Sequence, residues 1–190
     1  MAEIKKQVHV MIDLETLGLQ SNATVLSIGA VCFNSEVGVT DEFYAEIDPT
    51  TYPGVVDFGT LKFWFKEVEQ GSKVPINGTD SLNLVLMKLD EWFHKISGGY
   101  SAEIVLWANG TDFDIPKLYH MYAAILKDPQ WKYSNVRDAR TLYKLFGAIY
   151  GIKPPENTKK HHALEDARWQ ANWLISILSN LEELIDVSEL

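Results

Sequence analysis

A single cysteine, Cys32, is present in the sequence, which excludes an internal disulfide framework. No apolar run approaches the ~20 residues needed to cross a bilayer, and the starting segment MAEIKKQ lacks the apolar core and cleavage site of a signal peptide. We therefore expect no membrane partner and a cytoplasmic location. Because Cys32 lies in an apolar run, we expect it to be buried as an ordinary core residue.

Positive charge is scarce as well, since 17 lysines and arginines stand against 26 aspartates and glutamates, for a net charge of -9. Proteins that bind nucleic acids usually carry a basic surface, so this balance argues against a tight, extended nucleic-acid interface. The objection is weaker where clustered carboxylates hold divalent cations, because two such ions would add about four positive charges at one place. The composition therefore leaves open a short contact with one end of a nucleic-acid chain.

The chain has 190 residues, 46% of them hydrophobic, which suffices for one domain covering residues 1–190. Alternation and turn residues predict strands at 8–12, 25–33, 42–48, 104–108 and 131–136. Helical periodicity predicts helices at 60–70, 80–96, 114–126, 141–150 and 162–185. Three early strands with short connections, followed by strand–helix alternation, favour an α/β fold with a mixed five-stranded sheet flanked by helices.

Two acids, Asp13 and Glu15, follow the first apolar run and are separated by one leucine. In an extended backbone residues i and i+2 point the same way, so both carboxylates can face one small volume. Carboxylates at such a distance repel each other unless a cation lies between them, and hard oxygen ligands suit Mg²⁺ or Mn²⁺. A triplet of this kind is also common in solvated turns, so taken alone it leaves both interpretations open.

Acids recur at two later places, namely Asp114 after the fourth predicted strand and Asp166 in the last predicted helix, five positions after His161. The three segments, DLET at 13–16, NGTDFD at 109–114 and HHALEDA at 161–167, resemble the DEDD superfamily of 3′→5′ exonucleases. The resemblance is to the histidine-bearing, DnaQ-like DEDDh branch, which includes ribonuclease T, oligoribonuclease and polymerase proofreading subunits. The run WANG at 107–110 and the pair Phe63-Trp64 look like phage exodeoxyribonucleases and small bacterial exoribonucleases.

The resemblance implies a ribonuclease H-like fold in which Asp13, Glu15, Asp114 and Asp166 hold two divalent ions, Mg²⁺ or Mn²⁺. It also implies that His161 is the general base. These residue types suit phosphodiester hydrolysis, because two ions can serve both ends of an in-line displacement and a histidine can take a proton from water near neutral pH.

Substrate contacts are expected beside the acids and on the aromatic helix. The expected set is Leu14, Thr16, Leu17, Phe63, Trp64, Asn109 and Phe113. Leu17 could wedge against a base, and Phe63 or Trp64 could stack on one, although the consecutive aromatics could equally belong to the core.

Several neighbouring residues have competing interpretations. His162 lacks the five-residue offset from Asp166, and Asp112 precedes the motif phenylalanine, so we expect neither at the catalytic centre. Asp138 could be a helix cap or a further metal-site acid. The sequence does not decide whether Lys159 and Lys160 steer phosphate or only solvate a loop.

We therefore expect a metal-dependent exonuclease that removes nucleoside 5′-monophosphates from the 3′ end of single-stranded DNA or RNA, with DNA as the first expectation. One alternative is an oligoribonuclease-like activity on very short RNA. Another is a non-catalytic nucleic-acid-binding or polymerase-associated module. A homodimer is also compatible with the sequence, since several relatives are dimers.

Overall fold

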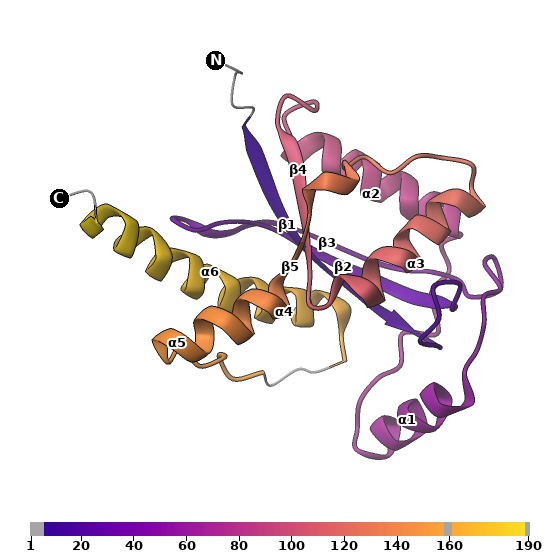
Figure 1. Cartoon of the computed structure of the whole chain (residues 1–190). Coiled ribbons are helices and arrows are strands. Elements are labelled where there is room, and N and C mark those ends of the chain that lie inside the picture. Colours follow the sequence, from indigo (N-terminus) through magenta and orange to yellow (C-terminus); the bar gives the residue numbers. More distant parts are fainter. Residues whose placement is uncertain (1–5, 158–160, 189–190) are drawn as a thin grey trace.

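The computed structural model describes residues 6–157 and 161–188, and a single sheet lies at its centre (Figure 1). Its strands are β1 (Gln7–Thr16), β2 (Val25–Asn34), β3 (Gly38–Glu46), β4 (Glu103–Ala108) and β5 (Val136–Asp138). The spatial order is β3-β2-β1-β4-β5, in which β1 pairs antiparallel with β2 and parallel with β4. The predicted mixed five-stranded sheet is therefore confirmed.

Helices cover both faces of this sheet (Figure 1). One face packs against α2 (Leu82–Ile96) and α3 (Thr111–Ala124). The other packs against α4 (Ala139–Leu142), the π-helical turn Tyr143–Gly147 and α6 (Ala163–Ser188), with the short α5 (Ala148–Tyr150) between them in the chain. Helix α1 (Phe58–Glu69) stands apart from both layers, and in the described part of the chain no helix is long and apolar enough to span a membrane.

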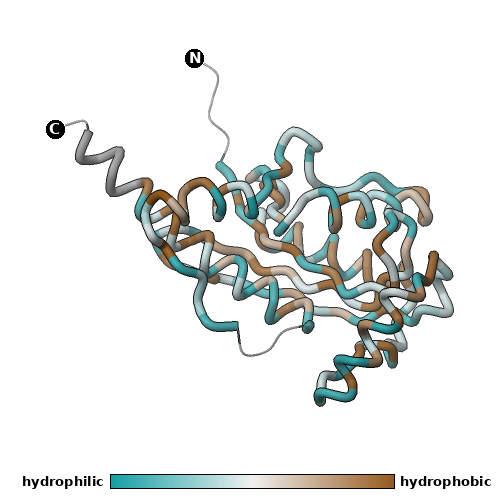
Figure 2. Tube along the Cα trace, turned by 60° about the horizontal axis from the view of Figure 1, so that its bottom comes forward, coloured by the Kyte–Doolittle hydropathy of each residue, from teal (hydrophilic) through white to brown (hydrophobic). Residues whose placement is uncertain are grey.

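Strand β1 distributes its side chains strictly between the two faces. Val10 and Ile12 belong to the apolar cluster under α2 and α3, whereas Met11 belongs to the cluster under α6. Because the side-chain period of a strand is two, Asp13 and Glu15 lie on the face of Met11. Figure 2 shows brown apolar stretches running through the middle of the molecule. The acidic pair lies near the carboxyl end of a core strand, on the face that packs against α6.

Gly29 on β2 allows α6 to approach this face closely. It pairs with Asp13 across the sheet, and a Cβ placed on it would lie 2.2 Å from backbone atoms of Ala163 and Leu164. That distance is far below van der Waals contact, so only glycine permits the first turn of α6 to rest on β2. The same approach brings Asp166, which also lies in the first turn of α6, over the end of β1.

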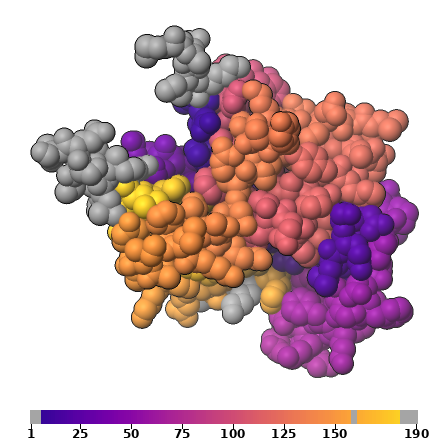
Figure 3. Space-filling model, viewed as in Figure 1, coloured from indigo at the N-terminus to yellow at the C-terminus, as the bar shows by residue number. Residues whose placement is uncertain are grey.

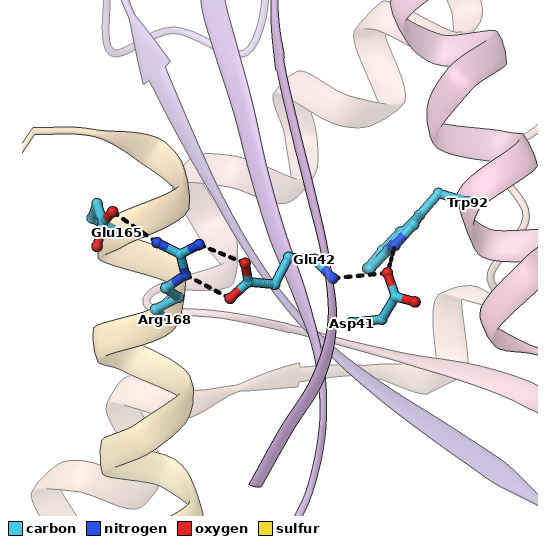
Figure 4. A network of polar contacts seen from close by, with 5 residues as sticks. All are labelled: Asp41, Glu42, Trp92, Glu165 and Arg168. Carbon is cyan, nitrogen blue, oxygen red and sulfur yellow. Dashed lines mark hydrogen bonds and ion pairs between the residues drawn. The ribbon is translucent and has the colours of Figure 1, made fainter.

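Two consecutive acids of edge strand β3, Asp41 and Glu42, form hydrogen bonds with helices on opposite faces of the sheet (Figure 4). The Glu42 carboxylate accepts hydrogen bonds from both Nε and Nη2 of Arg168 at 2.5 Å, and Nη1 of Arg168 also donates to Glu165 at 2.7 Å. Asp41, on the opposite face, accepts a hydrogen bond from the indole Nε1 of Trp92 at 2.9 Å. Neighbouring strand residues point in opposite directions, so one edge strand holds both α2 and the beginning of α6.

Several predicted boundaries were wrong, and two of them concern the acids. β1 continues through Thr16 because its pairing with β2 persists, so Asp13 and Glu15 lie within the strand and not beyond it. Helix α3 begins at Thr111, three residues before the predicted start at 114, which places Asp114 in its first turn. Gly110, with φ of 102°, turns the chain sharply from β4 into this helix.

The remaining differences are smaller. β3 begins at Gly38, four residues before the predicted start at 42. Helix α1 begins at Phe58, because the side chain of Asp57 accepts a hydrogen bond from the Thr60 amide and acts as the N-cap. The predicted strand at 131–136 is a 3₁₀ turn, Tyr133–Asn135, followed by the three-residue β5. Cys32 is buried, as expected.

Candidate active site

Three carboxylates from two elements meet at the end of β1. Asp13 and Glu15 project from the strand, and Asp166 comes from the first turn of α6. One oxygen from each lies within 4.8 Å of the others. Among the residues that the structure describes, no lysine or arginine forms an ion pair with any of the three. Within residues 6–157 and 161–188, the cluster therefore gathers negative charge without an ion-paired cation to balance it.

Asp114 is the fourth predicted acid, and it is buried in the first turn of α3. It does not belong to the three-oxygen cluster, but its negative charge contributes to the raised pKa values of Asp13 and Glu15. Its own carboxylate accepts a hydrogen bond from the backbone N–H of Leu14, which lies between the two β1 acids. The structure thus brings all four predicted acids to one end of the sheet.

Burial and mutual repulsion raise the pKa values of these acids. Burial, followed by the charges of the neighbouring acids, raises the pKa of Asp13 well above its ordinary value. Burial, Asp166 and Asp114 raise the pKa of Glu15 to about 8. Burial raises the pKa of Asp114 to about 7, although the Lys117 ammonium and the Leu14 N–H oppose the shift. Without a counter-charge the site therefore favours protons on these oxygens.

This donor set fits a divalent cation of the Mg²⁺ or Mn²⁺ type. All the donors are carboxylate oxygens, the ligands that hard cations prefer, and their raised pKa values show how unfavourable their charge is when it is not compensated. Asp13, Glu15 and Asp166 are the residues that would hold such an ion, and Asp114 is the adjacent acid available to a second one.

The metal-free protein is expected to lose stability as pH rises from about 4.5 to about 8, the ordinary and the raised pKa values of Glu15. In this window the folded protein keeps a proton on Glu15 that the unfolded chain has already released. The folded state therefore binds more protons, and its stability falls with increasing pH. Thermal melts in chelator across this range measure the effect, and at pH 8 saturating Mg²⁺ or Mn²⁺ should raise Tm by about 5–10 °C.

Glu15→Gln is the matched control for this measurement, because other groups titrate in the same range. Burial lowers the pKa of His9, for example, and its protonation makes the opposite contribution to the pH dependence. The decline of Tm between pH 4.5 and 8 should be shallower in Glu15→Gln than in the wild type. Equal slopes in the two proteins would contradict the assignment of the effect to the acidic cluster.

Asp166 is anchored by the segment that carries the two histidines. Its Oδ1 accepts a hydrogen bond from the Asn157 side chain at 2.7 Å, and its Oδ2 accepts the backbone N–H groups of His161 at 2.7 Å and His162 at 3.2 Å. His161 has a φ of 64°, in the left-handed region that residues other than glycine seldom adopt. The five-residue spacing between His161 and Asp166 thus corresponds to a hydrogen bond from the His161 backbone N–H to the Asp166 carboxylate.

His161 and His162 face different surroundings. The His161 ring lies edge-on to Phe63, with 4.9 Å between ring centroids, and lines the same cavity as Asp13. The His162 ring instead stacks on Tyr44 at 4.5 Å and is absent from the lining of that cavity. Geometry therefore favours His161 over His162 for contact with a molecule held at the acids.

The cavity beside the acids has a volume of about 450 Å³ and lies between β1, α1 and the start of α6. This volume is in the range of roughly 300–1,000 Å³ that is usual for small-molecule sites. Figure 3 shows α1 as a magenta lobe set apart from the orange segment that precedes α6. The cavity combines a carboxylate end with an apolar wall, which contains Leu14, Leu19, Phe63, Trp64 and Phe113.

Two aromatic residues of α1, Phe63 and Trp64, line the cavity, and they differ in burial. Trp64 is 3% exposed, packs with Leu17 and Leu26, and donates its indole N–H to the Thr16 carbonyl at 2.9 Å. Phe63 is 39% exposed, so of these two cavity-lining rings it is the one more available for stacking. Trp64 lines the cavity, but its burial makes it chiefly the residue that attaches α1 to β1.

Two expected substrate contacts lie elsewhere. Leu17 is buried against Leu26 and does not line the cavity, because its backbone pairs with Thr24 and turns its side chain inward. Leu19, 68% exposed, lines the cavity in its place. Asn109 is also outside the cavity lining, and its carbonyl accepts a hydrogen bond from Arg140 at 2.5 Å.

Two buried polar residues of the site were missed by the sequence reasoning. Gln170 donates to Asp13 Oδ1 at 2.8 Å, and its position four residues after Asp166, on the same helix face, was a usable signal. Lys117, 1% exposed, donates to the carbonyls of Leu19 at 3.2 Å and Phe113 at 3.0 Å, and its Nζ lies 3.3 Å from the centre of the Phe113 ring. It therefore holds two parts of the cavity wall together.

The other residues considered in the sequence are placed as follows. Asp112 is exposed, and Asp138 caps α4 by accepting the Arg140 N–H at 2.9 Å. Lys159 and Lys160 lie outside the described residues.

The chain is similar to known proteins in its family and in its structure. A model of the 3′–5′ exoribonuclease Rv2179c-like domain matches residues 8–178. No curated protein matches the sequence significantly. The nuclease domain of 3′hExo, a DEDDh family member, bound to rAMP, has a TM-score of 0.63 at 16% identity, covering 94% of this chain and 95% of that one.

Escherichia coli exonuclease I in complex with a dT13 oligonucleotide has a TM-score of 0.70 at 13% identity. The match covers 96% of this chain but 43% of exonuclease I, so the present chain spans less than half of that protein. At these identities the structural likeness establishes the fold, and the expected ribonuclease H-like arrangement is confirmed.

Proposed function

Because the chain belongs to the family of Rv2179c-like 3′–5′ exoribonuclease domains, we propose that this 3′–5′ exonuclease removes nucleoside 5′-monophosphates from the 3′ end of single-stranded RNA. The sequence alone favoured DNA, whereas the family description favours RNA. Proteins of similar fold bind both ribonucleotides and deoxyribonucleotides, since the 3′hExo structure contains rAMP and the exonuclease I structure contains dT13. Discrimination would come from a contact to the 2′-hydroxyl.

The observation that carries the proposal is the uncompensated cluster of Asp13, Glu15 and Asp166 at the end of an aromatic cavity. A protein gains no stability from buried carboxylates that repel each other, so their convergence indicates a site for cations. With Asp114 they would hold two Mg²⁺ or Mn²⁺ ions, which supply charge to activate a water molecule and to stabilise the leaving oxygen.

The chain's own residues then have separate tasks. Gln170 orients the Asp13 carboxylate, and the Asn157 side chain orients that of Asp166. His161, on the cavity wall, would accept the proton of the attacking water. Phe63 offers a partly exposed ring on which the terminal base can stack, a contact that tolerates any base.

The test is a paired digestion of 5′-labelled RNA and DNA oligonucleotides of the same sequence, with Mg²⁺, Mn²⁺ or chelator. We expect RNA to shorten stepwise from its 3′ end and chelator to abolish the reaction. DNA should be degraded about tenfold more slowly, because it lacks the 2′-hydroxyl and therefore one hydrogen bond to the protein. Faster digestion of DNA would overturn the proposed sugar preference.

The same assay separates the remaining alternatives. An oligoribonuclease-like enzyme would hydrolyse dinucleotides much faster than longer strands, so both lengths are compared under one condition. A non-catalytic binding module would bind the labelled strand without shortening it under any metal condition. Stepwise shortening of long RNA at a rate comparable with the hydrolysis of dinucleotides would exclude both.

A further inference from the structure

Helix α1 presents three neighbouring side chains to the His161 ring. Phe63, Trp64 and Glu67 share one side of this helix, since they are three and four residues apart. The ring of His161 lies edge-on to Phe63 at 4.9 Å and to Trp64 at 6.2 Å, measured between centroids. Its Nε2 lies 3.5 Å from Oε2 of Glu67. Three side chains of α1 therefore lie beside the imidazole.

Glu67 is itself held in place. The side chain is 16% exposed, and the Ser72 hydroxyl donates to the same oxygen, Oε2, at 3.2 Å. The Ser72 amide also donates to the Glu67 carbonyl at 3.0 Å, which closes the turn after α1. A chain of contacts therefore runs from Ser72 through Glu67 to His161.

Apart from its ring contacts with Phe63 and Trp64, the imidazole has one polar side-chain neighbour among the described residues. The backbone of His161 is fixed by its N–H bond to Asp166, but that bond leaves the two side-chain torsions free. Within the described ranges, Glu67 is the acidic side chain that lies within 4.0 Å of an imidazole nitrogen of His161. Among the described residues no other polar side chain contacts its ring nitrogens. A general base needs a defined ring orientation, which an acceptor on the second nitrogen commonly supplies.

We propose that Glu67 is a positioning residue for His161. Its carboxylate accepts the Nε2–H of the imidazole, holds the ring against Phe63, and leaves the lone pair on Nδ1 to receive the proton of the attacking water. The inference rests on the proposed function of His161 as the general base. It also gives α1 two tasks, since the same helix carries the stacking ring and the residue that orients the base.

Two variants of Glu67 and one matched control test this role. Glu67→Ala is expected to lower kcat about 10–100-fold with little change in KM, the usual cost of removing a residue that orients a catalytic group. Glu67→Gln keeps an acceptor oxygen and should retain most of the activity. Glu69→Ala changes an exposed acid of the same helix and should behave as the wild type. Thermal melts with and without Mg²⁺ confirm that each variant folds and binds metal.

The double variant shows whether Glu67 acts through His161. In a His161→Asn background, Glu67→Ala should cause no further loss of kcat, because its target is absent. If the losses of kcat in the two single variants multiply in the double variant, the proposal is overturned. It is also overturned if kcat is unchanged or increased in Glu67→Ala, or if Glu67→Gln and Glu67→Ala lose kcat equally. If His161→Asn itself had no effect, the proposed general base would fail, an outcome distinct from failure of Glu67 alone.

Discussion

Asp13→Asn is expected to lower kcat/KM for RNA hydrolysis by about 10³-fold or more. A cation at a hydrolytic centre contributes several kcal/mol of transition-state stabilisation, and about 1.4 kcal/mol corresponds to a factor of ten in rate. Asp13 is the most crowded of the acids, since burial and the three other carboxylates all raise its pKa. Asparagine is nearly isosteric and can still accept the hydrogen bond that Gln170 donates to Oδ1. The substitution therefore removes charge with little change in shape.

The same variant should be more stable than the wild type in chelator at pH 8, because one source of repulsion is gone. The increase in Tm caused by Mg²⁺ should disappear. This combination separates a loss of metal binding from a folding defect, which would lower Tm under every condition. Asp112→Asn is the control, since Asp112 is exposed in the same motif, and its activity should stay within about twofold of the wild type. Full activity of Asp13→Asn would place the reaction elsewhere.

His161→Asn is expected to lower kcat by about 10²–10⁴-fold, the usual contribution of a general base, while the Mg²⁺-dependent increase in Tm persists. Asparagine is chosen because it tolerates the left-handed backbone, with φ of 64°, better than alanine. The backbone N–H that binds Asp166 is retained, so the acidic cluster should remain assembled. Steady-state kinetics and thermal melts on the same preparation measure both effects.

His162→Ala provides the matched comparison. The His162 ring stacks on Tyr44, and its contact with Asp166 uses the backbone N–H, which the substitution leaves in place. Its kcat should remain within about twofold of the wild type. A large loss in His162→Ala together with near-normal activity in His161→Asn would reverse the assignment of the base.

The local sequence pattern was a good guide where the structure depends on near neighbours. The alternation in β1 placed Asp13 and Glu15 on one face, and the spacing of His161 and Asp166 corresponds to one backbone hydrogen bond. The sequence pattern predicted less well which side chains are buried, because burial depends on packing between distant segments. Three consecutive aromatics cannot share a helix face, but only the apolar residues beneath α1 determine that Trp64 is buried.

Sequence alone determined the candidate residues for the chemistry and their order along the chain, because motif spacing and side-chain periodicity are properties of the local sequence. Tertiary structure alone decided how near these residues come to one another. Gly29 allows the first turn of α6 to rest on β2, and this contact, between segments more than a hundred positions apart, brings Asp166 to the acids of β1. The placement of α1, which holds Glu67 beside His161, likewise results from packing, and no periodicity in the chain encodes it.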